Sequence, residues 1–220
     1  ILGKAGIPLV GGTGDGGKVS VNGTVYEDAD VYAFVKNNGG KVAVYKENLY
    51  KPMPGYRFIA SNTDRSRYYV GELNGKSSKQ AYMDALHISE SNIINQTFHN
   101  PIGKMNGQDI CIISLKEVSG NGLCCYRQVN DSDVLVLLEE QDYNEILDET
   151  LQRIRRDFNH ISGVFSINCV FRYLLFSQEH HMEDYLKTMS TLGDHAGLIG
   201  FGEHYNQQFV NQTMTCVVFE

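Results

Sequence analysis

The sequence predicts an α+β fold with mixed, mainly antiparallel sheets and helices packed on their faces. The first seventy residues are apolar runs separated by glycine and asparagine turns, a pattern typical of antiparallel hairpins. Later in the chain, apolar residues recur at helical spacing, most clearly at Tyr143, Leu147, Leu151, Ile154 and Phe158. Because the helices fall between blocks of hairpins, the pattern favours α+β over a doubly wound parallel sheet.

Three hairpins are expected in the first part of the chain. Their turns are Asn22-Gly23, which is the strongest short hairpin signal, Asn37-Asn-Gly-Gly40 and Ser61-Asn-Thr-Asp64. The expected strand pairs are 18–21 with 24–26, 30–35 with 41–45, and 57–60 with 67–70. A boundary near residue 75 separates this strand-only block, 1–75, from a mixed block, 76–220.

The mixed block contains the predicted helices and most of the polar motifs. Helices are expected at 80–86, from an N-cap at Ser89 to about Phe98, at 143–158 and at 178–190. The expected strands are 109–118, 123–129, 133–139, 163–172, 196–203 and 209–219. We expect the last three strands to be neighbours in one sheet, with the two long helices packed together on one of its faces.

Composition narrows the functional class. Of 220 residues, 42% are hydrophobic and 20% are charged, which is ordinary for a soluble globular protein. The formal net charge of −7 speaks against nucleic acid, because such binding depends on clustered lysine and arginine. No apolar run approaches the eighteen or so residues that a membrane span needs, so no membrane contact is expected.

The cysteines and the first residue indicate the compartment. Cys111, Cys124, Cys125, Cys169 and Cys216 are odd in number and lie mostly in apolar strands, which favours free thiols over a disulfide framework. The chain begins with isoleucine and shows no signal-peptide pattern, so we interpret it as a fragment of a longer protein. The expected location is cytoplasmic.

Two segments late in the chain carry a pattern of site residues. The strand expected at 163–172 has Ser166, Asn168, Cys169 and Arg172 towards its exit. Glycines then precede a lone acid and two polar residues, namely Gly197, Gly200, Gly202, Glu203, Asn211 and Thr213. An arginine matches a carboxylate in bidentate geometry, and an acid suits an ammonium group. The pattern predicts a small polar-ligand site, although Arg172 and Glu203 could equally form one internal ion pair.

These motifs resemble the FIST module, an intracellular ligand-sensing domain of bacterial signalling proteins and some F-box proteins. The resemblance rests on Phe165-Ser-x-x-Cys-x-x-Arg172, Ala196-Gly-x-x-Gly-x-Gly-Glu203 and Asn211-x-Thr213, with weaker matches at 7–13, 70–82 and 100–103. It implies that residues 1–75 are the tail of the N-terminal FIST half and that 76–220 are the C-terminal half.

The resemblance also implies a function. It implies a cytoplasmic sensor, possibly part of a chemoreceptor, that binds an amino acid or a similar metabolite and acts on an attached signalling output domain. The implied ligand-binding residues are Arg172, Glu203, Cys169, Asn168, Gly202, Asn211 and Thr213.

Two other classes of function stay open from the sequence. Cys169 could be the nucleophile of an enzyme with His195 or His204 as its base, although a buried small hydrophobe is the commoner role of such a cysteine. The chain could also be a protein-interaction scaffold. The histidines lack metal-ligand spacing, so neither a metal nor a cofactor is expected.

Overall fold

The computed structural model describes residues 6–107 and 109–220, and the chain divides into two compact units. The inserted unit is Tyr50–Gln141, and the terminal unit combines the described residues up to Leu49 with Asp142–Glu220. This division differs from a single boundary near residue 75. Strands and helices alternate through both units and most strand pairs are antiparallel, so the predicted α+β class is confirmed.

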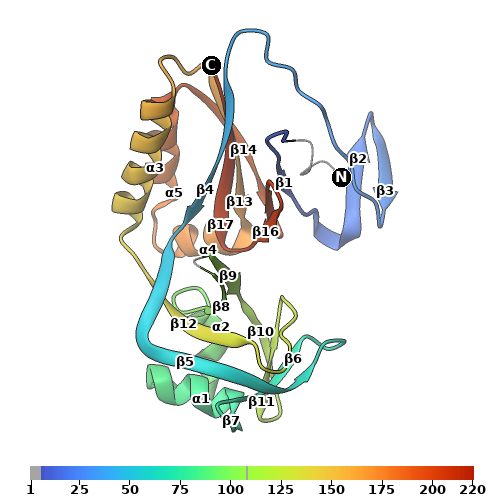
Figure 1. The fold of residues 1–220 in the computed structure, drawn as a ribbon, viewed down its shortest axis with the longest axis vertical. Helices are drawn as coiled ribbons and strands as arrows, with labels where there is room; N and C mark the ends of the chain where they lie inside the picture. The colour runs from blue at the N-terminus through green and yellow to red at the C-terminus, as the bar shows by residue number, and fades with distance from the viewer. Residues whose placement is uncertain (1–5, 108) are drawn as a thin grey trace. The chain divides into compact units, whose positions relative to one another are not determined.

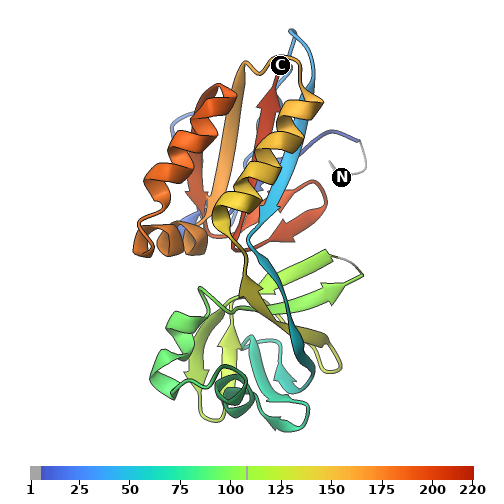
Figure 2. The same ribbon diagram turned by 90° about the vertical axis from the view of Figure 1, so that its left-hand side faces the viewer.

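The inserted unit is a strongly curled sheet with two helices beside it (Figures 1 and 2). The strand order is β10-β11-β6-β5-β12-β8-β9, and the short β7 pairs with β6. The strands are β5 (Tyr50–Asp64), β6 (Tyr69–Leu73), β7 (Lys76–Ser77), β8 (Ile102–Asn106), β9 (Asp109–Ile113), β10 (Leu115–Ser119), β11 (Gly122–Cys125) and β12 (Val134–Glu140). The helices are α1 (Ser78–Leu86), the 3₁₀ turn η3 (Glu90–Asn92) and α2 (Ile93–Gln96).

The core of the inserted unit lies between this sheet and its helices. Helix α1 contacts β6 and β11, and its Tyr82 is buried with Leu73, Leu123 and Leu135. The Tyr82 hydroxyl donates to the carbonyl oxygen of Asn100 at 2.7 Å, which satisfies the polar end of this buried ring.

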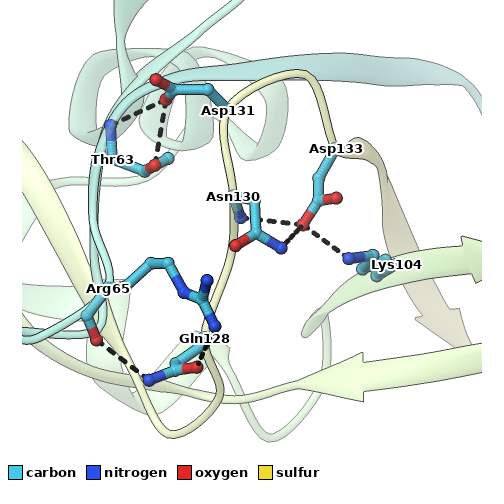
Figure 3. A network of polar contacts seen from close by, with 7 residues as sticks. All are labelled: Thr63, Arg65, Lys104, Gln128, Asn130, Asp131 and Asp133. Atoms are coloured by element: carbon cyan, nitrogen blue, oxygen red, sulfur yellow. Dashed lines mark hydrogen bonds and ion pairs between the residues drawn. The ribbon is translucent and has the colours of Figure 1, made fainter.

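Polar contacts hold the loop between β11 and β12 against its neighbours (Figure 3). An Asp131 oxygen accepts hydrogen bonds from both the backbone nitrogen and the hydroxyl of Thr63, at 3.0 and 2.9 Å. An Asp133 oxygen accepts from the backbone nitrogen of Asn130 at 2.8 Å and from Lys104 Nζ at 2.7 Å. Both acids have donors from the protein itself, so this network is structural.

The terminal unit is built on a four-stranded sheet with the order β14-β13-β17-β4. Its members are β4 (Val42–Asn48), β13 (Gly163–Cys169), β14 (Asp194–Gly200) and β17 (Thr213–Phe219). Strands β13 and β14 are parallel, and the other two pairings are antiparallel. This confirms that the three last predicted strands are neighbours in one sheet.

Helices lie on one face of this sheet and small strands on the other (Figures 1 and 2). The helices are α3 (Tyr143–Asp157), α4 (Val170–Gln178), α5 (Met182–Met189) and the 3₁₀ turn η4 (Ser190–Leu192). The opposite face contacts β1 (Val10–Gly12) and β15 (Glu203–Tyr205), which form a three-stranded sheet with β16 (Gln208–Val210). The turn η2 (Asp15–Gly17) precedes the predicted hairpin, β2 (Lys18–Val21) with β3 (Thr24–Glu27).

Alternation along β13 assigns its side chains to the two faces. Asn168 donates from Nδ2 to the Tyr185 hydroxyl of α5 at 3.0 Å, so Asn168 faces the helices. Ile167 faces the small strands, because a Cβ added to Gly12 of β1 would lie 2.9 Å from Ile167 Cγ2. Adjacent residues of a strand point to opposite faces, so Cys169 shares the face of Ile167.

Several predicted elements are wrong in extent or pairing. No strand forms at 30–35, and the strand predicted at 41–45 is β4, which pairs with β17 instead of forming a local hairpin. The strand predicted at 163–172 ends at Cys169, where helix α4 begins. The strand predicted at 209–219 is broken after Val210, and Gln212 adopts a positive φ of 52°.

The predicted long helices both form and lie on the same face of the sheet (Figure 2). Arg155 of α3 donates to Thr191 Oγ1, just beyond α5, at 2.6 Å, and the Tyr143 ring lies 5.4 Å from that of His181, which precedes α5. All five cysteines are free, as the sequence predicted.

The N-cap of α3 provides a test of the fold. Asp142 Oδ1 accepts from the backbone nitrogens of Asn144 and Glu145 at 2.8 and 3.1 Å. Asp142→Ala removes this cap and is expected to lower the free energy of unfolding by about 1 kcal/mol in urea denaturation. The exposed Asp148 of the same helix supplies the control, since Asp148→Ala is expected to change it by less than about 0.5 kcal/mol. Equal effects of the two substitutions would contradict the cap.

A candidate ligand site at the carboxyl end of two parallel strands

The two predicted charged residues lie beyond the same end of the terminal unit's sheet. Arg172 is the third residue after β13 ends at Cys169, and Glu203 is the third after β14 ends at Gly200. Because β13 and β14 are parallel neighbours, their carboxyl ends meet at one sheet edge. Ligands of α/β sheets bind beyond the carboxyl ends of strands, so this edge is a plausible place for a site on topology alone.

Arg172 is buried in the first turn of α4, on the helix-covered face. Its exposed fraction is 1%, and its Nη2 pairs with Glu47 Oε1 of β4. Its guanidinium carbon lies 4.7 Å from the ring centroid of Phe176 and 5.3 Å from that of Tyr185. Arg172 Nε and Nη1 are buried and have no hydrogen-bond partner among the described residues. The guanidinium therefore retains donors that a ligand can use.

Glu47 is the partner that the sequence did not reveal. It is 2% exposed and stands opposite Met214 of β17, which in turn stands opposite Asn168 of β13. Directly opposite residues share a face, so Glu47 and Asn168 both face the helices. The second oxygen of Glu47 and the side-chain oxygen of Asn168 have no partner among the described residues. The one available signal was alternation along β4, which puts Glu47 on the same face as Ala43 and Tyr45.

Glu203 lies on the opposite face and is fully buried. Its Oε2 accepts from the backbone nitrogen and the hydroxyl of Thr213, at 3.3 and 2.9 Å, and the Cys169 thiol also hydrogen-bonds to this carboxyl group. Burial raises the pKa of Glu203, and the hydrogen bonds and the charge of Arg172 offset only part of this rise, so that the pKa is about 7 instead of 4.5. Glu203 Oε1 has no partner in the described part of the chain.

Arg172 and Glu203 do not form the internal ion pair that the sequence left open. Arg172 pairs with Glu47 on the helix-covered face, and Glu203 bonds to Thr213 on the face of the small strands. The two groups share no hydrogen bond. The charge of Arg172 lowers the pKa of Glu203 through space, and this is the smallest of the effects on that pKa.

Asn211 and Gly202 border Glu203. A Cβ built on Gly202, whose φ is 137°, would lie 2.5 Å from Phe209 Cζ and 3.5 Å from Asn211 Oδ1. Asn211 is buried, and its Oδ1 lacks a partner among the described residues. Gly202 is thus required by the close packing of Phe209 and by its own backbone angle. Its predicted contact with a ligand stays a prediction.

Cys169 does not have the surroundings of an activated nucleophile. Burial, together with the charge of the nearby Glu203, raises the pKa of its thiol to about 12, so the thiol is protonated at neutral pH. His195 Nε2 lies 2.9 Å from Ser166 Oγ, and Ser166 shares the helix-facing side of β13 with Asn168. The His204 ring meets the Phe209 ring edge to face, with centroids 5.0 Å apart. Within the described part of the chain, neither His195 nor His204 hydrogen-bonds to Cys169.

The buried polar atoms without partners concentrate in the terminal unit. Among the described residues, every such side-chain atom belongs to this unit, and the residues that carry them include Glu47, Asn168, Arg172, His181, Glu203, Asn211 and Thr215. Native proteins contain few such atoms, because each costs about 1–3 kcal/mol. Most of these residues lie at or next to the sheet edge where β13 ends and β17 begins. Such a set is expected where a polar molecule supplies the missing hydrogen bonds.

These features describe a mixed α+β domain with an incompletely paired polar cluster at a sheet edge. A scan against protein-family models matches the FIST C domain to residues 79–206, which is more than half of the chain. The chain therefore belongs to the FIST C domain family, as its motifs predicted. No curated protein and no solved structure matches it significantly.

Family membership supports a general role as a sensory signal-transduction domain. The matched region includes part of the inserted unit and part of the terminal unit. The assignment of residues 1–75 to the N-terminal FIST half stays a prediction, and its first five residues lie outside the described part of the chain. Among the helices of the described residues, none is long and apolar enough to cross a membrane.

Removing one member of the Arg172–Glu47 ion pair tests whether the pair is buried in the folded protein. Arg172→Ala leaves the Glu47 carboxylate buried without its partner, so the free energy of unfolding is expected to fall by about 3–5 kcal/mol. The double variant Glu47→Ala, Arg172→Ala is expected to lose less than the sum of the two single variants. Urea denaturation of all four proteins measures the coupling, and strictly additive losses would show that the pair does not exist in solution.

The raised pKa of Glu203 predicts a pH dependence of stability. The unfolded chain releases this proton near its ordinary pKa of 4.5 and the folded chain near 7, so the folded state binds more protons between these values. Stability therefore falls as the pH rises from about 4.5 to above 7, by on the order of 3 kcal/mol from this group. Glu203→Gln removes the titration, so the stability of the variant relative to wild type is expected to increase over this range.

Denaturation in urea at pH 5 and pH 8 measures this difference. Glu149→Gln on the exposed side of α3 is the matched control and is expected to run parallel to wild type. If Glu203→Gln also runs parallel to wild type, Glu203 is not titrating in the folded core.

Proposed function

We propose that this chain is the ligand-sensing module of a cytoplasmic signalling protein and binds a small polar metabolite of the amino-acid class. The ligand lies at the edge where β13 and β14 end. Arg172 binds its acid group, and Asn168, Glu203, Asn211 and Thr213 line the site, with Cys169 and Gly202 beside Glu203. This set of residues is the one that the family resemblance implies.

One observation carries the proposal, namely that unpaired buried donors and unpaired buried acceptors lie at the same end of one sheet. Arg172 offers the donors Nε and Nη1, whereas Glu47, Asn168, Glu203 and Asn211 offer acceptor oxygens. A ligand with only acceptors would leave the protein oxygens unsatisfied, and a ligand with only donors would leave the guanidinium unsatisfied. An α-amino acid carries both kinds of group on adjacent atoms.

Sensing requires that the ligand bind two conformations of the module with different affinities. We propose that occupancy of the sheet edge is passed to an attached output domain, such as the signalling part of a chemoreceptor. Helix α4 begins at the site, because its first turn contains Arg172 and its N-cap position is Cys169. A change in the contacts of Arg172 therefore acts directly on the start of a helix.

A second candidate function, a protein-interaction scaffold, is favoured by an exposed apolar segment. Four apolar side chains are between 39% and 71% exposed, namely Val31, Tyr32, Phe34 and Val35, and the rings of Tyr32 and Phe34 meet edge to face with centroids 5.4 Å apart. Such a cluster is typical of a surface that contacts another protein. This role is compatible with ligand sensing, because the segment lies outside the polar cluster.

A thermal-shift screen against the common amino acids and small carboxylates tests the sensor. At least one amino acid is expected to raise the melting temperature by several degrees, because a ligand of the native state stabilises it by mass action. Arg172→Lys keeps the charge beside Glu47 but loses the planar fork, so this shift is expected to disappear. Lys187→Met removes an exposed surface ion pair with Glu183 and is expected to keep the full shift. If no compound stabilises wild type, the sensor proposal is wrong.

A further inference from the structure

Glu47 and Arg172 present opposite charges side by side, and each keeps unpaired atoms. One Glu47 oxygen is taken by Arg172 Nη2, and the other has no partner among the described residues. Arg172 uses Nη2 for this pair and keeps Nε and Nη1. Both side chains are at most 2% exposed, so the unpaired atoms face the interior and not bulk solvent.

We propose that Glu47 accepts the ammonium group of the ligand and thereby makes the site select zwitterionic amino acids against simple carboxylates. This inference rests on the proposed function. It assigns the ammonium group to Glu47 instead of Glu203, the acid that the sequence suggested for this role. The free Glu47 oxygen accepts from the ligand's N–H groups while the free guanidinium nitrogens donate to its carboxylate.

Glu47 fits this role better than Glu203 because of where each carboxyl group lies. Glu47 contacts Arg172, so an ammonium bound to Glu47 and a carboxylate bound to Arg172 are close together, as they are in an α-amino acid. Glu203 lies on the other face of the sheet and bonds to Thr213. In addition, the raised pKa of Glu203 leaves a large part of it neutral at pH 7, which weakens its attraction for a cation.

Asn168 supplies a second acceptor on the same face. Its Nδ2 donates to the Tyr185 hydroxyl, and this hydrogen bond fixes the orientation of the amide. The amide oxygen Oδ1 has no partner among the described residues and is the atom that can accept from a ligand. An ammonium group has three N–H donors and is satisfied only when several oxygens surround it. Glu47 and Asn168 stand opposite Met214 in the strands on either side of it, so both side chains leave the sheet on the same face.

A cleft on the surface of the terminal unit runs past residue 47, and the Glu47 side chain itself is 0% exposed. It lies between β4 and α3, and its walls include Glu47, Asn48, Ile146, Thr150 and Arg153. The polar walls suit a charged metabolite better than an apolar one. The same negative charge also opposes a plain carboxylate, because a bare anion that approaches Arg172 must lie beside Glu47 without an ammonium to neutralise it.

Paired ligands that differ only in the amine test this selection. The probes are L-alanine with propionate, L-leucine with 4-methylpentanoate, L-phenylalanine with 3-phenylpropionate and L-glutamate with glutarate. Binding to wild type, Glu47→Gln, Glu203→Gln and the surface variant Glu183→Gln is measured by calorimetry at pH 7. For the pair that binds, wild type is expected to prefer the amino acid. Glu47→Gln is expected to reduce this preference on the order of 10-fold or more, because a charge-assisted hydrogen bond is lost.

Glu183→Gln, on the exposed surface of α5, is the matched control and is expected to keep the preference of wild type. Glu203→Gln compares the two candidate acids directly. Glu47→Gln keeps the shape of the side chain, and its circular dichroism and melting curve check that it folds. If Glu47→Gln does not fold, Glu47→Asp keeps the charge but withdraws the oxygen by one methylene, and a smaller loss of preference is expected from it.

The outcomes separate the two proposals. If Glu203→Gln loses the preference and the Glu47 variants keep it, the assignment to Glu47 is overturned while the sensor function stands. If wild type binds both members of a pair equally, the selection is overturned and a general carboxylate sensor remains. If wild type binds no member of any pair, the selection and the amino-acid sensor are both overturned.

Discussion

A buried guanidinium is the constraint around which the terminal unit is organised. An arginine side chain keeps its charge in a protein, so burying it requires an anion and hydrogen-bond acceptors close by, and aromatic rings can pack on its faces. Arg172 is buried in this way. Glu47 supplies the anion from β4, while Phe176 and Tyr185 supply the rings from α4 and α5. These groups come from three elements that are distant in sequence. The arginine therefore ties the sheet to its helices, yet it still has nitrogens that no described residue satisfies.

The periodic elements of the fold were predictable because their patterns are local. The stripe on α3, the strands β13, β14 and β17, and the hairpin at Asn22-Gly23 all follow from residues close together in the chain. The wrong elements were those decided by distant partners. Residues 41–45 have the same β-propensity whether they pair locally or with β17. Their backbone in fact pairs with that of β17, which lies far away in the sequence.

The candidate site was predictable in part for the same reason. Arg172 and Glu203 stood out because a charge next to an apolar strand needs a partner, and both are indeed buried. The partner itself could not be found, because Glu47 lies 125 residues before Arg172 and in an ordinary-looking strand. The glycines near Glu203 did indicate that other groups approach the backbone closely there. At Gly12 and Gly200 the approaching groups are Ile167 and the other glycine's backbone, so the packing of two sheets explains these glycines without a ligand.

The insertion of Tyr50–Gln141 between β4 and α3 has a consequence for how the chain acquires its structure. The inserted unit is one continuous segment, so all its contacts can form without the rest of the chain. The terminal unit cannot close its sheet until Val42–Asn48 meets Thr213–Phe219 across the whole inserted segment. High contact order slows folding, and a long loop adds to the entropy of closure. During synthesis, the buried arginine pair is therefore completed only after the last strand is made, so the order of events on the ribosome places the inserted unit first.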